Sequence, residues 1–413
     1  MRSNNSTQEP TRILLISHND NFGGAARAVN RLRKCLNSEG TQAKLLVMQK
    51  YNDQKDIAEF GLVRKIIGQI YSKIDIRFCN YLDPGGSTWK TSAFFGAITA
   101  RYINKFPADV VNFHWIGHGL ISLRQLNKIK KPIIWTLQDD WALQPLNHFQ
   151  VERRTTRRLG LTGGYIHAHL IRYISSLKRK FILKDNVILI ALNSKMNSEL
   201  LDKYPEKSAK IFVIANPVDL DIFAPDRRNF YADSLGLSVG KPTLLYLGGI
   251  NDMRKGWDLL QKSLNFTHNS FNLIVIGGHT KKIISNNQEI NILGLKKVLD
   301  LNNLIDLYNL STAVIVPSRN EGLPQTATES LSCGTPVIGF RIGGLNDIIF
   351  DNYNGYLVQP FNTQKLGLAI DQTINLGKNF FKHNCRLFAE KEFAYRTIKS
   401  KYDSVFDLKF TQN

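Results

Sequence analysis

The chain has 413 residues, of which 43% are apolar, and this length exceeds one ordinary core and predicts two domains of roughly 200 residues each. Its 54 Lys and Arg residues against 34 Asp and Glu residues give a net charge of +20, which favours contact with nucleic acid, an anionic membrane or a phosphorylated ligand. No apolar run is long enough for a transmembrane helix, and the polar start MRSNNSTQEP lacks the apolar core of a signal peptide, so neither segment is expected.

The first half of the chain alternates strands and helices. RILLIS (12–17) predicts a buried parallel strand, residues 25–40 predict a helix, and residues 43–49 predict the next strand. This opening is typical of a doubly wound α/β sheet. No motif is placed between residues 50 and 107. The later strands of this half are predicted at 109–115, 132–141, 187–193 and 210–223.

A second alternation follows a linker near residues 217–229. Helices are predicted from Trp257, over residues 301–309, and from the EGLPQ loop to Cys333. Two such halves predict two doubly wound domains with a cleft between them, because ligands bind outside the carboxyl ends of parallel strands. The predicted strands are 241–249, 271–278, 289–294, 312–318, 335–344 and 354–360.

The stretch EGLPQTATES (321–330) places one glutamate on a glycine-proline loop and a second in the helix that follows. Gly322 permits unusual backbone dihedrals, and Pro324 suits a first helical turn, where its missing N–H costs nothing. The N–H groups of a helix start attract anions, so Glu321 and Glu329 would flank a phosphate and accept hydrogen bonds from hydroxyls. This combination suits a nucleotide sugar; the alternative is two solvated charges.

Glycine turns follow other strands of the same half. In GGINDMRKGW (248–257), Arg254 and Lys255 precede Gly256 at a helix start, which suits a pyrophosphate. VIGG (275–278) and RIGG (341–344) also end strands with paired glycines. One such pair is ordinary turn chemistry, but their gathering at strand ends of one half indicates a ligand site.

The cysteines predict neither a zinc site nor a disulfide framework. None of them forms a C-x-x-C pair or has a metal-type partner nearby, and a reduced cytosolic compartment fits best. They are Cys35, Cys79, Cys333 and Cys385.

The order RKG, VIGG, ILG, VPSRNEGLPQTATESLSCGTPVIG, GG and NGYLV resembles the retaining glycosyltransferases of family 4, which have the GT-B fold. SHNDNFGGAARAVNRL is similar to the first glycine loop and helix of the family's exopolysaccharide and lipopolysaccharide branch. The resemblance extends over residues 12–380. It implies transfer of a hexose with retention at the anomeric carbon, without a metal or another cofactor, from a UDP- or GDP-linked sugar.

The same resemblance implies roles for individual residues. Glu321, Lys255 and Arg254 would form the catalytic group, with Glu321 beside the donor sugar and Lys255 on the pyrophosphate. Glu329 would bind the ribose hydroxyls, and Leu295 would lie where main-chain groups meet the base. The full set expected to bind the donor is Gly23, Gly24, Gly249, Gly278, Leu295, Gly322, Leu323 and Glu329.

The sequence departs from the family pattern at two places. Gly249 stands where the family often has an arginine, for which Arg254 would substitute. Gln138, in TLQDDW, stands where family members commonly carry a histidine. On the acceptor side, His114, Gln138 and Asp139 are expected near the reacting sugar; the alternatives are a packed histidine and an aspartate that caps the next segment.

Residues 153–184 are rich in cations. In this stretch, apolar residues such as Ile166 recur at helical spacing, while cations such as Lys178 fall elsewhere. One interpretation is a helix with its apolar side on the core and a solvated basic face. The other is a basic face against an anionic membrane surface.

These observations predict an N-terminal acceptor-side domain (1–217), a donor-binding domain (218–390) and a helical tail (391–413) that packs back on the first domain. The expected function is hexose transfer to a glycan or lipid-linked acceptor in surface polysaccharide assembly, in the cytoplasm or at the inner face of the plasma membrane. One rival is a GT-B protein without transferase activity, such as an epimerase or a degenerate binding partner. The other, a basic nucleic-acid-binding protein, is disfavoured because no binding motif or aromatic stacking platform is found.

Overall fold

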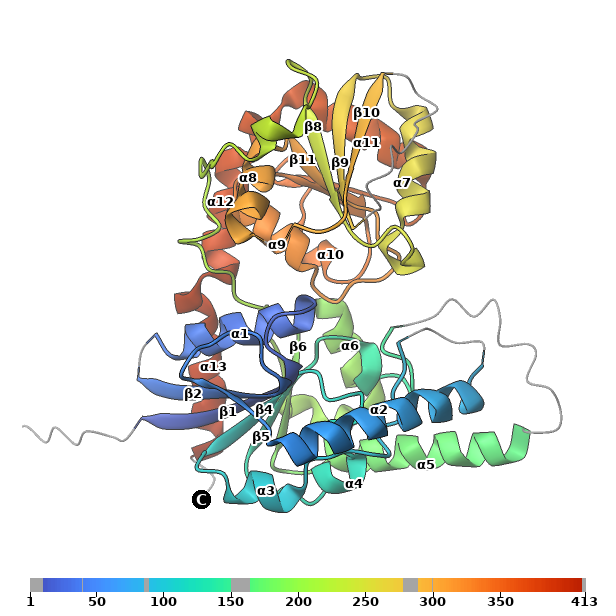
Figure 1. Ribbon diagram of the computed structural model, residues 1–413, viewed down its shortest axis with the longest axis vertical. Coiled ribbons are helices and arrows are strands. Elements are labelled where there is room, and N and C mark those ends of the chain that lie inside the picture. The colour runs from blue at the N-terminus through green and yellow to red at the C-terminus, as the bar shows by residue number, and fades with distance from the viewer. Residues whose placement is uncertain are drawn as a thin grey trace, which may run out of the picture. The chain divides into compact units, whose positions relative to one another are not determined.

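In the computed structural model the chain forms two compact units, one within residues 1–216 and 399–413 and the other within residues 217–398 (Figure 1). Each unit is a parallel β-sheet covered by helices, which confirms the predicted pair of doubly wound α/β domains. The structure describes residues 10–38, 40–84, 89–149, 164–277, 289–298 and 300–410.

The sheet of unit 1 has seven strands in the order β3-β2-β1-β4-β5-β6-β7, all paired in parallel. The order reverses between β1 and β4, so the loops that follow these two strands diverge at the switch point. The strands are β1 (Thr11–Asn19), β2 (Thr41–Gln49), β3 (Ile57–Glu59), β4 (Val110–Phe113), β5 (Ile133–Thr136), β6 (Val187–Ala191) and β7 (Ile211–Val213).

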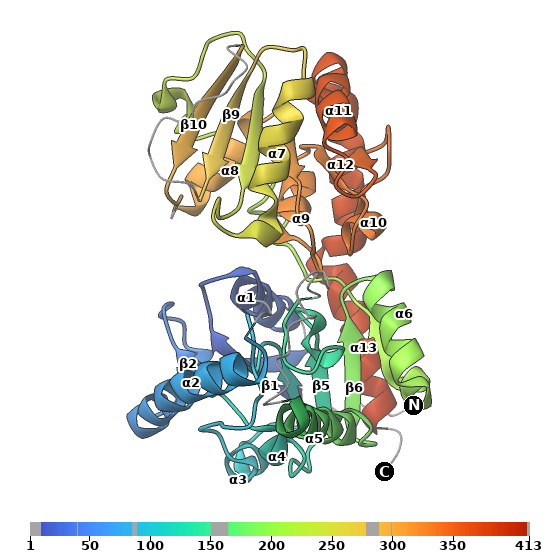
Figure 2. The same ribbon diagram turned by 90° about the vertical axis from the view of Figure 1, so that its right-hand side faces the viewer.

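Helices from distant parts of the chain cover this sheet. The last helix, α13 (Tyr395–Phe410), crosses from unit 2 into unit 1 at Lys399, and the Tyr402 hydroxyl lies 3.0 Å from the Thr136 hydroxyl at the end of β5 (Figure 2). The other helices are α1 (Gly24–Leu36), α2 (Leu62–Leu82), α3 (Ala100–Lys105), α4 (Leu123–Leu126), α5 (Gly164–Ile182) and α6 (Ser194–Lys203), with 3-10 turns η1 (Asp140–Ala142) and η3 (Pro205–Lys210).

Two predicted elements of this unit are shorter in the structure. The strand expected over 210–223 is only β7, because Pro217 lacks the N–H group that a longer ladder needs and the Val218 N–H donates to the carbonyl of Phe393. The helix expected over 25–40 ends at Leu36. The region without a predicted motif contains β3, α2 and α3.

Unit 2 has six parallel strands in the order β10-β9-β8-β11-β12-β13, and this order reverses between β8 and β11. All six lie within or within one residue of the predicted ranges. They are β8 (Thr243–Leu247), β9 (Phe271–Ile276), β10 (Ile290–Leu295), β11 (Ala313–Val316), β12 (Val337–Phe340) and β13 (Gly355–Val358).

The helices of unit 2 cover both faces of its sheet. Because β8 and β11 flank the switch point, the segments after these strands meet where ligands bind in open α/β sheets. The helices are α7 (Trp257–Ser263), α8 (Leu301–Leu310), α9 (Gln325–Ser332), α10 (Leu345–Ile348), α11 (Thr363–Leu376) and α12 (Lys378–Phe393), with 3-10 turns η4 (Ala232–Leu235), η5 (Met253–Lys255) and η6 (Leu264–Phe266).

Helix α5 agrees with the first interpretation of the basic stretch at most positions, because Ile174 and Phe181 are fully buried while Arg179 and Lys180 are exposed. Two positions depart from it, and contact with a membrane stays a prediction. Lys178, expected on the basic face, is 2% exposed, whereas Ile166, expected at the core, is 64% exposed. The Lys178 ammonium donates to the carbonyls of Trp141 (2.6 Å), Gln144 (2.7 Å) and Pro145 (3.1 Å) and lies 3.6 Å from the Trp141 ring centroid. Residues 153–163 of the stretch lie outside the described residues. Among the residues that are described, no helix is long and apolar enough to cross a membrane.

Replacement of Lys178 by Met is expected to destabilise unit 1 by about 2 to 4 kcal/mol, because three carbonyls, one of them fully buried, lose their donor. The matched control is Lys180→Met, since Lys180 is exposed on the same helix. Urea unfolding monitored by tryptophan fluorescence measures both. Equal stability of the two variants would contradict a structural role for the buried ammonium.

Candidate functional site

The carboxylate of Glu321 is the centre of a charged cluster in unit 2. Its Oε1 accepts hydrogen bonds from the Lys255 ammonium (2.6 Å) and the Ser318 hydroxyl (2.8 Å) and lies 3.4 Å from Nη1 of Arg254. Lys255 and Arg254 belong to η5, after β8, whereas Ser318 and Glu321 follow β11. The fold therefore brings together the predicted catalytic residues Glu321, Lys255 and Arg254 at the switch point of the sheet.

Glu321 is ionised at neutral pH although its residue is only 8% exposed. Burial alone would raise the pKa of this carboxyl, but Lys255, Arg254 and their hydrogen bonds outweigh that effect and hold the pKa below its usual value. The two cations remain partly exposed, with 23% and 21% of their side chains accessible. The site therefore presents accessible positive charge above a buried negative one.

The loop after β11 also holds η5 through the backbone and through Arg319. The Arg319 N–H donates to the carbonyl of Arg254 (2.7 Å), and its guanidinium donates to the Met253 carbonyl (2.6 Å) and to both carboxylate oxygens of Asp258 (2.8 and 2.6 Å). A bidentate arginine–carboxylate pair is geometrically specific. These contacts fix the segment that carries Lys255 against the segment that carries Glu321.

Glycines permit this close approach. Gly256 has φ +69°, and a Cβ atom there would lie 1.9 Å from the carbonyl oxygen of Pro317. On the other side of the loop, a Cβ atom on Gly344 would lie 2.0 Å from the carbonyl oxygen of Gly322. The glycines of RKG and RIGG are therefore required by packing around the Glu321 loop.

Glu329 lies inside the protein rather than on an exposed helix face. It is the fifth residue of α9, its exposure is 0%, and its Oε2 accepts a hydrogen bond of 2.7 Å from the Tyr308 hydroxyl of α8. Leu323, just before the helix, is 7% exposed. The interpretation of Glu329 as a solvated charge is wrong, and its contact with ribose stays a prediction.

The remaining donor-side residues occupy separate strand ends. Gly249 follows β8, and a Cβ atom there would meet nothing closer than 3.7 Å, so this position has room for a side chain that the sequence does not supply. Leu295 ends β10, and its carbonyl accepts the N–H of Gly277 at 2.9 Å. Gly278 lies outside the described residues.

Gly23 and Gly24 belong to the other unit. Gly23 has φ +92° and precedes α1, whose first residue is Gly24. Residues 21–24 are exposed, and no side chain caps the start of α1. Exposed helix starts attract anions, and the contact of Gly23 and Gly24 with a diphosphate stays a prediction.

The acceptor-side residues form a hydrogen-bonded row after β4 and β5. The amide of Gln138 exchanges two hydrogen bonds of 3.1 Å with Asn216, and its Nε2 lies 3.3 Å from Nδ1 of His114. His114 is 2% exposed, and burial lowers its pKa to about 3, so the ring is neutral. His114 is therefore a packed histidine in the structure.

Asp139 joins two residues that sequence reasoning missed. Its Oδ2 accepts from His148 Nδ1 (2.7 Å) and Trp115 Nε1 (3.1 Å), while its Oδ1 accepts the N–H of Trp141 and caps η1. Neither His148 nor Trp115 belongs to a motif in the sequence, and only the fold brings them to Asp139. The predicted capping role of Asp139 is present, and its contact with an acceptor stays a prediction.

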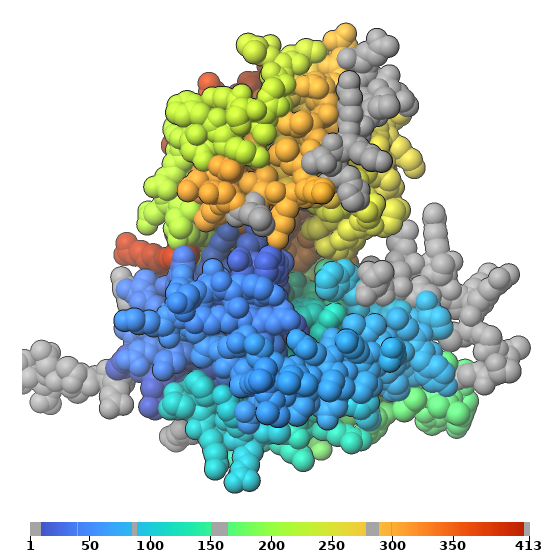
Figure 3. All heavy atoms as spheres, viewed as in Figure 1, coloured from blue at the N-terminus to red at the C-terminus, as the bar shows by residue number. Residues whose placement is uncertain are grey.

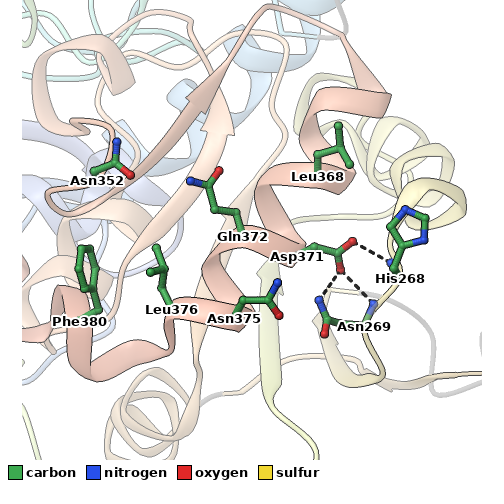
Figure 4. Close-up of a pocket in the computed structure, with 9 residues that line it drawn as sticks. All are labelled: His268, Asn269, Asn352, Leu368, Asp371, Gln372, Asn375, Leu376 and Phe380. Atoms are coloured by element: carbon green, nitrogen blue, oxygen red, sulfur yellow. Dashed lines mark hydrogen bonds between the residues drawn. The ribbon is translucent and has the colours of Figure 1, made fainter.

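A pocket of about 540 Å³ opens elsewhere on unit 2 (Figure 4). Its lining includes His268 and Asn269, which precede β9, so it lies at the amino ends of the strands, opposite the Glu321 cluster. The Asp371 carboxylate there accepts both backbone N–H groups of these residues, at 2.7 and 3.0 Å. Its charge is used to hold a turn.

No group of three or more His, Cys, Asp or Glu side chains in the described part of the chain could hold a metal ion.

Comparison with known families divides the chain as the structure does. The sequence profile of a family described as Glycosyltransferase Family 4 matches residues 22–222, and that of a family described as Glycosyl transferases group 1 matches residues 227–387. The chain is 27% identical over 240 residues to a D-inositol 3-phosphate glycosyltransferase of Xylanimonas cellulosilytica. That match includes 54% of this chain and 56% of the relative, so the chain spans just over half the relative's length.

Solved structures with the same fold include one of a glycosyltransferase and one of a protein in complex with a nucleotide sugar. The Anabaena protein HepE, in complex with UDP-glucose, matches with a TM-score of 0.64 at 14% identity, over 96% of this chain and 99% of that one. WaaG, a glycosyltransferase involved in lipopolysaccharide biosynthesis, matches with a TM-score of 0.64 at 15% identity, over 95% and 99%. These likenesses confirm the predicted GT-B fold.

Replacement of Gly256 by Ala is expected to lower the stability of unit 2 by about 1 to 3 kcal/mol, since the added Cβ collides with the Pro317 carbonyl in a strained backbone. Gly249→Ala is the matched control and is expected to change stability by no more than about 0.5 kcal/mol. Differential scanning calorimetry measures the unfolding transition of each variant. A Gly256→Ala protein as stable as the control would contradict the packing constraint.

His114 makes stability depend on pH. Because its folded pKa of about 3 lies below the ordinary 6.5, the unfolded chain takes up the proton first, and stability is lost as pH falls from 6.5 towards 3. Between pH 6.5 and pH 5 the free energy of unfolding is therefore expected to fall by up to about 2 kcal/mol less in His114→Asn than in the wild type. Urea titrations at the two pH values test this, with the exposed His169→Asn as control. Parallel losses in all three proteins would show that His114 is not the titrating group.

Proposed function

This chain belongs to glycosyltransferase family 4, and we propose that it transfers a hexose from a nucleoside diphosphate sugar to an acceptor hydroxyl, with retention at the anomeric carbon. The observation that carries the proposal is the cluster of Lys255, Arg254 and the buried, ionised Glu321 at the switch point of unit 2.

The two cations suit the charge that develops during transfer. As the bond between the anomeric carbon and the diphosphate oxygen breaks, the electron pair leaves with the diphosphate, and Lys255 and Arg254 stabilise the added charge. The new bond from the acceptor oxygen forms on the same face, and the acceptor proton passes to the departing phosphate oxygen. No protein base is required in this sequence of events.

Glu321 is suited to binding rather than to proton donation. A carboxyl whose pKa is held below its usual value is ionised at neutral pH and has no proton to give. It can accept hydrogen bonds from sugar hydroxyls while it orients the Lys255 ammonium. Glu329 and the start of α9 lie on the same segment and would complete the donor site at the ribose and the phosphates.

UDP is the first donor nucleotide to test, because the solved structure of HepE contains UDP-glucose; GDP is the alternative. For the acceptor we propose a glycan or a lipid-linked glycan used in surface polysaccharide assembly, at the cytoplasmic face of a membrane. WaaG, whose fold this chain shares, is involved in lipopolysaccharide biosynthesis. His114, Gln138 and Asp139 are the acceptor-side residues under this proposal.

One feature favours a second candidate, a donor-binding protein that does not catalyse transfer. Gln138 stands where the family commonly carries a histidine, and its amide exchanges two hydrogen bonds with Asn216. In that case a nucleotide sugar would bind without turnover. Binding and turnover must therefore be measured separately.

Replacement of Lys255 by Met is expected to weaken UDP-sugar binding about tenfold, and Glu321→Gln is expected to lower the transfer rate about a hundredfold. Isothermal titration with UDP, GDP and ADP gives the binding, and release of nucleoside diphosphate from UDP-glucose gives the turnover. Lys262→Met, an exposed cation on α7, is the matched control.

The outcomes separate the candidates. If the wild type binds UDP and turns over UDP-glucose, and both are weakened in Lys255→Met, the transferase is supported. Binding without turnover in the wild type supports the non-catalytic candidate. Absence of binding to all three nucleotides would reject both.

A further inference from the structure

Helix α2 presents an apolar face to solvent. Its buried side consists of residues such as Gly68, Asp75 and Cys79, which pack on unit 1. The opposite side repeats at intervals of three and four residues, as one face of a helix does. The apolar members of this outer face are 38–71% exposed, and they are Leu62, Val63, Ile66, Ile70, Ile74 and Tyr81. Single exposed aliphatic side chains are ordinary, but a continuous row marks an interaction surface.

The charges on the outer face of α2 are all positive. Lys73 and Arg77 are exposed, fall on the same side as Ile70 and Ile74, and form no ion pair with a residue in the described ranges. The only acidic residue of α2 is Asp75, which is fully buried and accepts hydrogen bonds from Thr91 and Ser92. An anionic partner therefore meets no opposing carboxylate of this helix.

Helix α5 extends the outer face of α2. The last turn of α2 meets the first turn of α5, where the rings of Tyr81 and His167 lie 4.5 Å apart. Near that contact Tyr165 and Ile166 are 79% and 64% exposed. Helix α2 crosses the face of unit 1 that is turned to the viewer in Figure 3. The combined surface pairs apolar and aromatic side chains with cations.

We propose that the outer face of α2, with the adjoining end of α5, docks on an anionic lipid bilayer. Helices that lie in a membrane interface combine one apolar face with flanking Lys and Arg and few acids, and anionic lipids attract such cations. A second copy of this chain is the weaker occupant, because Lys73 and Arg77 of two copies would repel each other. The proposal goes beyond glycosyl transfer and does not depend on it, since it concerns a surface of unit 1 alone.

Vesicle sedimentation of the full chain tests the docking surface. The vesicles are pure phosphatidylcholine or phosphatidylcholine with phosphatidylglycerol, at low and at high salt. At low salt the wild type is expected to bind the vesicles with phosphatidylglycerol at least about tenfold more strongly than those of pure phosphatidylcholine. High salt is expected to reduce this difference. The double variants Ile66→Ser with Ile70→Ser, and Lys73→Glu with Arg77→Glu, are each expected to lose at least about tenfold in binding.

The matched controls lie on unit 2. Leu368→Ser with Leu376→Ser removes exposed apolar groups, and Lys365→Glu with Lys391→Glu reverses exposed charges by the same amount. Both controls are expected to bind vesicles within about twofold of the wild type. Melting temperatures verify that every variant is folded.

Any of three results would overturn the proposal. The first is an absence of binding to anionic vesicles at low salt. The second is equal binding by the α2 variants and the controls. The third is a lipid-independent dimer, seen by analytical ultracentrifugation, that Ile66→Ser with Ile70→Ser abolishes; it would assign the surface to a second copy. Because no nucleotide enters the assay, its failure leaves the proposed transfer activity untouched.

Discussion

A buried carboxylate that must remain charged sets the architecture of the candidate site in unit 2. Removing an ion from water is costly unless a counter-charge and hydrogen bonds accompany it, and Glu321 has both in Lys255, Arg254 and Ser318. These partners come from segments after two different strands. The pairing therefore demands that the segments after β8 and β11 touch, which is possible only because Gly256 places no side chain between them. The charged cluster of the candidate site and the packing around it therefore depend on the same contact between these two segments.

The sequence predicted much of this unit because its signals are local. Each strand of the second sheet is a short apolar run, and paired glycines follow β8, β9 and β12, so periodicity and turn chemistry locate the elements. The meeting of η5 with the Glu321 loop followed from the rule that carboxyl ends of parallel strands share one edge. Residue burial did not follow. A glutamate in a helix is usually exposed, so the sequence does not predict that Glu329 is buried. Its burial is evident only from the structure, where it accepts a hydrogen bond from Tyr308.

Unit 1 was harder to predict because its polar contacts join residues far apart in the chain. Asp139 meets His148 and Trp115 through the fold of two loops, and Gln138 meets Asn216 across the sheet. No spacing in the sequence encodes such contacts. Helix α2 was missed for a different reason: apolar residues on both of its faces obscure the period of a half-buried helix, since one face packs on the core and the other meets solvent.

The cations behind the net charge of +20 therefore have different roles in the structure. Lys178 is an interior hydrogen-bond donor that holds a loop, Lys255 and Arg254 neutralise a carboxylate and face the proposed diphosphate, and Lys73 stands among aliphatic side chains at the surface. Composition predicts that a basic protein meets anions, yet a cation contributes to that attraction only where its head is accessible and not already neutralised. Lys255 and Arg254 are two partly exposed cations on the single carboxylate of Glu321, next to glycine turns, so one positive charge remains there. Lys73 and Arg77 are exposed in a second setting, a row of apolar side chains. The first setting suits a soluble phosphorylated ligand, and the second suits an anionic surface with an apolar interior.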